Sequence, residues 1–162
     1  AIYVAAQRQE VSGVVSFAGP AVMGPTAYPL EAVQRMRKMG IIRDPDFPYD
    51  IEEWALEGEK LSPDKWIGKV SPRPILLIHG DSDNTVNPDN MYKLFECAGE
   101  PKYLRLLPGV GHRFRQEQAA IGEVLLWISE KFGDFACVHR YPTVVVSIGQ
   151  RGFMLSQQMG NV

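Results

Sequence analysis

The chain has little of several features that mark common classes of protein. Its 162 residues include only two cysteines, Cys97 and Cys137, and the absence of a Cys-x-x-Cys pair argues against a disulfide framework or a thiol metal site. No apolar run reaches the length of about 18 residues that crosses a membrane, and no signal peptide pattern opens the sequence, so we expect a cytoplasmic protein. The net charge of only -2 gives no electrostatic reason to expect nucleic acid as a partner.

The pattern of apolar residues predicts one α/β fold. The chain is 45% hydrophobic and 22% charged, which is ordinary globular composition. Strands are expected at Val11–Phe17, Pro74–Ile78 and Tyr103–Leu107. Helices are expected at residues 1–10, Leu30–Met39, Ile51–Lys60, a turn after Ser62, Pro88–Ala98 and Gln116–Phe132. Strand and helix alternate with short links from residue 74 onward, which is typical of a parallel sheet, so we expect three parallel strands with flanking helices.

Two segments fall outside this alternation. Residues 20–70 hold short helices and many prolines and no expected strand. Residues 133–162 form a tail beyond a boundary near Gly133, with one β-branched run at Thr143–Val146. Between these segments, the last long helix is expected to turn one apolar face inward, and that face comprises Ile121, Val124, Leu125 and Ile128.

Two turns with polar side chains follow neighbouring predicted strands. Residues 75–86 read Ile-Leu-Leu-Ile-His-Gly-Asp-Ser-Asp-Asn-Thr-Val, and residues 108–114 read Pro-Gly-Val-Gly-His-Arg-Phe. Adjacent parallel strands lie about 4.8 Å apart and end at the same edge of a sheet, so we expect Asp83 and His112 to come within hydrogen-bond range. A histidine that a carboxylate holds in one tautomer is the base that acyl-transfer chemistry needs.

Other polar residues at this edge have alternative interpretations. Asp81 directly follows the turn glycine, so we expect capping or loop hydrogen bonding from it rather than the role of the acid. His79 ends a buried strand, and we expect a structural, hydrogen-bonded role for it. A metal site built from His79, Asp81, Asp83 and His112 lacks a His-Glu-x-x-His or similar spacing, so we expect no metal ion and no cofactor.

Both turns resemble the C-terminal half of the α/β-hydrolase superfamily. That family commonly has a His-Gly-x-x-Asp-x-x-Val turn after its seventh strand and a Gly-x-Gly-His or Gly-x-x-His turn after its eighth. The matching residues are His79, Gly80, Asp83 and Val86 for the first turn and Gly109, Gly111 and His112 for the second. The resemblance covers residues 1–132 and looks most like the esterase and prolyl-oligopeptidase-like branch. It implies that Asp83 is the acid and His112 the base of a triad whose chain order is Ser, Asp, His.

The same resemblance implies that the nucleophile lies outside these residues. Residues 1–10 are similar to the helix that follows the nucleophile turn, and Val11–Phe17 is similar to the sixth strand. We therefore expect a truncated or processed N-terminus, with the nucleophile upstream of Ala1. Residues 20–70 fall where such enzymes insert a lid. The sequence has no Gly-x-Ser-x-Gly segment, and its one comparable serine, Ser147, follows a strand and precedes a possible helix; we interpret it as part of a stray strand and tail.

In the resembled fold, the strand that bears the nucleophile pairs with the sixth strand. Val11–Phe17 is therefore expected to be an open sheet edge, and its β-branched, uncharged sequence is typical of an aggregation-prone edge. Thr143–Val146 is the one unassigned β-run that could cover it. The sequence thus predicts either docking of the tail on this edge or self-association of the chain.

We interpret the chain as the acid–base half of a serine hydrolase that acts on an ester, thioester or peptide-like acyl bond, inactive alone for lack of the nucleophile. The partner is then a small-molecule or peptide-like acyl substrate, and the oligomeric state is open. The mostly apolar residues expected in the lid favour a substrate without high charge; they are Met23, Tyr28, Phe47, Tyr49, Trp54 and Trp66. The alternative is a non-catalytic, truncated hydrolase-fold protein with a binding role or none.

Overall fold

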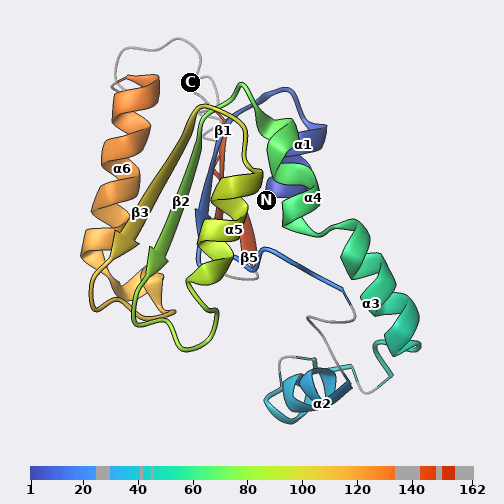
Figure 1. Ribbon diagram of the computed structural model, residues 1–162. Coiled ribbons are helices and arrows are strands. Elements are labelled where there is room, and N and C mark those ends of the chain that lie inside the picture. The colour runs from blue at the N-terminus through green and yellow to red at the C-terminus, as the bar shows by residue number, and fades with distance from the viewer. Residues whose placement is uncertain (25–29, 41, 45, 134–142, 149–150, 156–162) are drawn as a thin grey trace, which may run out of the picture.

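A computed structural model describes residues 1–24, 30–40, 42–44, 46–133, 143–148 and 151–155 (Figure 1). Its helices are α1 (Ile2–Gln7), α2 (Leu30–Lys38), α3 (Ile51–Lys60), α4 (Pro63–Trp66), α5 (Asp89–Cys97) and α6 (Gln118–Phe132), with 3-10 turns η1 (Ile67–Val70) and η2 (Phe114–Gln116). Its strands are β1 (Val11–Phe17), β2 (Ile75–Gly80), β3 (Lys102–Leu107), β4 (Thr143–Ile148) and β5 (Arg151–Leu155). The three predicted strands are confirmed, with ends that differ from the prediction by at most two residues.

The strands form one sheet in the order β3-β2-β1-β4-β5. The first four are parallel, and β5 pairs antiparallel with β4 at the edge. In the register, Val14 of β1 lies opposite Ile75 of β2, and Gly80 at the end of β2 lies opposite Leu107 at the end of β3. The strands β1, β2 and β3 therefore present their carboxyl ends along one edge, which is where ligands bind in open parallel sheets.

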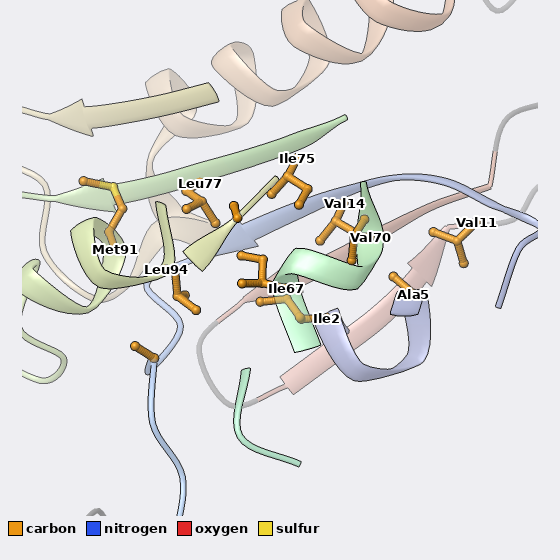
Figure 2. Packing of buried hydrophobic residues seen from close by; sticks show 12 residues of the cluster. Ile2, Ala5, Val11, Val14, Ile67, Val70, Ile75, Leu77, Met91 and Leu94 are labelled. Atoms are coloured by element: carbon orange, nitrogen blue, oxygen red, sulfur yellow. The ribbon is translucent and has the colours of Figure 1, made fainter. Parts of the chain in front are cut away.

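Helices cover both faces of the sheet. One face packs on α1, η1 and α5, and Figure 2 shows the side chains between them, among them Ile2, Ile67 and Leu94 beside Val14 and Ile75. The other face packs on α6 (Figure 1). Because both faces are buried, the first four residues of β2, before His79 and Gly80, are all apolar, which is the pattern of a buried parallel strand rather than of an alternating one.

The inward face of α6 differs from the prediction at two positions. The buried residues of α6 are Ala120, Val124, Trp127 and Ile128. Ile121 and Leu125, which were expected to face inward, are 45% and 58% exposed. Residues 124–128 are all apolar, so spacing alone does not select the face, and packing against the sheet selects it instead. Although α6 spans 15 residues, no helix in the described part of the chain is long and apolar enough to cross a membrane.

The predicted lid region, residues 20–70, contains α2, α3, α4 and η1 and no strand within its described residues. In Figure 1, α2 and α3 extend away from the sheet, whereas α4 lies beside α1. Two hydrogen bonds join the segment after β1 to the start of α4: Asp64 N donates to Ala21 O at 3.0 Å, and Met23 N donates to the side-chain Oγ of Ser62 at 3.0 Å. The side chain of Asp50 caps α3 by accepting from Glu53 N at 2.9 Å.

The edge of β1 is covered by β4. The two strands run parallel over their whole length, with Val14 opposite Val145 and Ser16 opposite Ser147. This is the docking of the tail that the sequence predicts, and it adds β4 and β5 to the three expected strands. The helix considered after Ser147 is wrong, because the chain returns as β5 and pairs with β4. β5 occupies the side of β4 that faces away from β1.

Candidate active site

The turn after β2 places the side chain of Asp83 at the carboxyl edge of the sheet. One oxygen, Oδ1, accepts hydrogen bonds from two backbone amides, Thr85 N at 2.8 Å and Val86 N at 3.0 Å. An aspartate that accepts from amides two and three residues later forms a local turn of its own, which Asp, Asn, Ser and Thr favour. The side chain is fully buried, so the turn holds a carboxylate inside the protein with one oxygen already occupied.

His112 approaches the other oxygen of this carboxylate from the turn after β3. Its Nδ1 lies 2.9 Å from Asp83 Oδ2, and its side chain is 32% exposed. Because a carboxylate only accepts, Nδ1 carries the proton, and Nε2 of the neutral ring is left as a base. The predicted approach of these two residues is therefore present. They are 29 positions apart in the sequence and meet because their turns follow neighbouring strands.

The pKa of Asp83 reflects opposing influences. Burial raises the pKa of this carboxyl, but the amide of Val86, the hydrogen bond and charge of His112 and the amide of Thr85 all lower it. The lowering influences prevail, and the pKa of Asp83 lies below its ordinary value. The carboxylate therefore stays ionised at neutral pH and is available to accept the proton of His112 Nδ1.

Asp81 holds the turn that carries His112. Its Oδ1 accepts from Gly109 N at 2.7 Å and from Ser82 Oγ at 2.9 Å. This agrees with the loop role expected for Asp81 and separates it from Asp83. Gly109 has a φ of +71°, a left-handed conformation that favours glycine, and this conformation lets the turn bend back toward β2.

The glycine at the end of β2 allows the two turns to touch. A Cβ at Gly80 would lie 2.6 Å from the carbonyl carbon of Val110 and 3.0 Å from its Cβ. Ser82 N also donates to Val110 O at 3.2 Å. Since only glycine leaves room for this backbone contact, Gly80 sets how closely the His112 turn approaches Asp83.

His79 reaches Asp83 from the strand itself, a contact that sequence reasoning missed. The ring is 1% exposed, and its Nε2 lies 2.9 Å from Val86 O and 3.2 Å from Asp83 Oδ2. Its ring meets that of Phe114 edge-on, with centroids 6.4 Å apart. The four-residue spacing from His79 to Asp83 was the available signal, but spacing in a turn does not reveal which way the loop folds back.

The sequence also led us to consider a metal site and a lid. Among the described residues, no group of three or more His, Cys, Asp or Glu side chains could hold a metal ion.

A hollow of about 520 Å³ lies in the predicted lid region, lined by Arg37, Asp46, Pro48, Tyr49, Asp50, Ile51 and Glu52. None of these residues comes from the turns of Asp83 and His112. Of the predicted lid residues, Tyr28 lies outside the described residues, and Trp66 packs edge-on against Tyr3 of α1.

Comparisons with curated proteins match a limited part of the chain. No family model matches it. The uncharacterized protein YfhR of Escherichia coli (strain K12) is 43% identical over 54 residues, which are 33% of this chain and 19% of that protein. YfhR of Salmonella typhi is 35% identical over 54 residues, which are 33% of this chain and 18% of that protein. The chain thus spans about a fifth of the length of the curated relatives it matches.

Comparisons with solved structures cover 80% of the chain. The esterase domain of a Rhodothermus marinus protein gives a TM-score of 0.56 at 22% identity, over 55% of that chain. The monoacylglycerol lipase of Paleococcus ferrophilus gives 0.55 at 18% identity, over 63% of that chain. The α/β hydrolase GrgF from Penicillium sp. sh18 gives 0.51 at 16% identity, over 58% of that chain.

The chain has a partial α/β-hydrolase fold. It spans less than two thirds of each of these three solved structures. The three parallel strands β1, β2 and β3 and their flanking helices are the part of the α/β-hydrolase fold that the two polar turns predicted. Asp83 and His112 lie in turns that follow β2 and β3 of this fold.

Proposed function

We propose that Asp83 and His112 are the acid and the base of a serine hydrolase that cleaves an ester, thioester or peptide-like acyl bond. The observation that carries the proposal is the 2.9 Å contact of His112 Nδ1 with a buried carboxylate. This contact fixes the tautomer that leaves Nε2 without a proton, on a ring that solvent and substrate can reach. The fold shared with an esterase domain and a monoacylglycerol lipase supports the acyl chemistry.

In this mechanism His112 moves one proton in each half of the reaction. Nε2 accepts the hydroxyl proton of the serine as its oxygen attacks the carbonyl carbon, and it gives that proton to the leaving group when the tetrahedral intermediate collapses. Asp83 keeps its negative charge and stabilises the imidazolium that forms between the two steps. The low pKa of Asp83 suits this role, because a protonated carboxyl could not stabilise the cation.

We propose that the nucleophile precedes Ala1 in the longer protein. The family order Ser, Asp, His places the serine upstream of Asp83, and no serine upstream of it stands in a Gly-x-Ser-x-Gly segment. Ser82 lies in the turn after β2, but its Oγ donates to Asp81 Oδ1 at 2.9 Å, and it directly precedes the acid itself. Ser147 lies within β4, opposite Ser16, and not in a strand-to-helix turn. A Gly-x-Ser-x-Gly segment within about ten residues before Ala1 would support the proposal directly.

One observation favours the alternative, a non-catalytic protein with a hydrolase-type fold. β4 pairs with the edge of β1, and the strand that bears the nucleophile occupies this edge in the resembled fold. A nucleophile strand therefore has to displace β4 before it can pair there. A chain that keeps β4 in place would have the acid and the base without the nucleophile, and its role would be binding or none.

Hydrolysis of short p-nitrophenyl esters tests both candidates. The purified 162-residue chain should show no rate above background, because the nucleophile that we propose lies outside it. A clear rate that Ser147→Ala abolishes would contradict the upstream nucleophile and make Ser147 the nucleophile.

The same assay on a longer protein that includes the preceding segment tests the pair itself. His112→Ala or Asp83→Asn should lower kcat about 10³-fold or more, whereas Asp81→Asn should cost far less. A larger loss for Asp81→Asn than for Asp83→Asn would show that the acid is wrongly assigned.

A further inference from the structure

The carboxylate of Asp83 accepts three hydrogen bonds, and it has one further close contact, with the ring of His79, a residue with no part in the proposed reaction. Oδ1 faces the two amides of its own turn, and Oδ2 faces His112 Nδ1 at 2.9 Å and His79 Nε2 at 3.2 Å. Both atoms near His79 Nε2, Asp83 Oδ2 and Val86 O, are acceptors, so Nε2 carries the proton. His79 thus joins the strand end to both the carboxylate and the far end of the turn.

We propose that His79 is a positioning residue that holds Asp83 Oδ2 in place for His112. The inference rests on the proposed roles of Asp83 and His112. The two amides hold only Oδ1, so without His79 the single partner of Oδ2 is His112, the ring that exchanges protons during the reaction. The N–H of His79 bonds to Val86 O and lies between this carbonyl and Oδ2, with Nε2 3.2 Å from Oδ2. Its positive end therefore attracts Oδ2 from a fixed place on β2, and the carboxylate keeps its orientation when His112 changes its protonation.

His79 is itself well fixed. It is the fifth residue of β2, it is 1% exposed, and Phe114 packs against its ring edge-on. Phe114 lies two residues past His112, so the same aromatic contact links the His79 ring to the turn that carries His112. Because the His79 ring is anchored in this way, it holds Asp83 at a fixed position relative to the sheet.

The tautomer of His112 reports this positioning without any need for hydrolysis. With His79 in place, the neutral His112 ring should be mainly the Nδ1–H form, which nitrogen-15 shifts of labelled histidine rings distinguish. Met and Gln have nearly the same shape, but only Gln has an N–H donor. We expect the ratio of Nδ1–H to Nε2–H to fall at least about fivefold in His79→Met, the factor that loss of about 1 kcal/mol of hydrogen bonding gives. His79→Gln should keep most of the wild-type ratio.

Controls separate this inference from the proposed function. Ile78→Val loosens the neighbouring residue of β2 and should leave the His112 ratio unchanged. Asp83→Asn should change the ratio, and if it does not, the acid–base pair itself is wrongly assigned. If Asp83→Asn changes the ratio and a folded His79→Met does not, only the positioning role of His79 is refuted. Should His79→Met fail to fold, the wild-type chain still decides, because an Nδ1–H tautomer of His79 could not donate to Asp83 and would overturn the inference.

Discussion

Replacing Gly80 with alanine should separate the two turns of the candidate site. The added Cβ would meet the backbone of Val110, 2.6 Å from its carbonyl carbon and closer still to its carbonyl oxygen. The φ of Gly80 is not in the left-handed region, so alanine is acceptable to the local backbone and the whole effect comes from the neighbouring turn. Because the obstacle is backbone rather than a flexible side chain, the turn itself must move away.

The size of the effect follows from overpacking. Forcing a methyl group into a filled site costs about 1–3 kcal/mol, and each kcal/mol lowers Tm by about 2–4 °C for a domain of this size. Movement of the turn also weakens the bonds of Ser82 N to Val110 O and of Gly109 N to Asp81 Oδ1, now 3.2 Å and 2.7 Å long. We expect Gly80→Ala to lower Tm by about 2–12 °C and to reduce the Nδ1–H fraction of His112.

Gly122 in α6 provides the matched control. It is exposed within a helix, and a Cβ added there meets nothing within 4 Å. Gly122→Ala should therefore raise stability by about 0.5–1 kcal/mol, the ordinary gain of alanine over glycine in a helix. Thermal melts followed by circular dichroism measure both changes. Equal Tm values for Gly80→Ala and the wild type, or equal losses in the two variants, would refute the close-approach argument.

Three further predictions concern the acid, α6 and the sheet edge. The pKa of Asp83 is lowered on folding, so the stability that its carboxylate contributes is complete above about pH 3.9 and is lost as pH falls through the folded pKa. In urea unfolding, the free energy of unfolding of Asp83→Asn should therefore fall less on acidification than that of the wild type. Ile128→Ala should cost about 2–5 kcal/mol and the exposed Leu125→Ala less than about 1 kcal/mol, and similar costs would contradict the observed face of α6. A chain ending at Phe132 should melt lower and elute larger on size exclusion, because the edge of β1 is then open; an equally stable monomer would show that β4 covers nothing.

Features that depend on local pattern could be predicted from the sequence. Val11–Phe17 is rich in β-branched residues and is followed by an Ala-Gly-Pro turn, so this strand could be predicted from residues that are close together in the sequence. The same holds for Asp83 and His112, because each turn follows an apolar strand and parallel strands end at one edge. Chain order and short links were enough to bring these two residues together.

Tertiary contacts determine features for which the sequence offered several suitable residues. Asp81 and Asp83 follow the same strand, and the Gly109 amide that bonds to Asp81 is the contact behind the loop role that the sequence predicted for it. In α6, apolar residues are so numerous that packing against the sheet, not periodicity, buried Trp127 and exposed Leu125. The sequence left docking of the tail and self-association as alternatives, and the tertiary structure shows β4 paired with β1. The contact of His79 with Asp83 depends on how the turn folds back in space, which a pattern along the chain does not reveal.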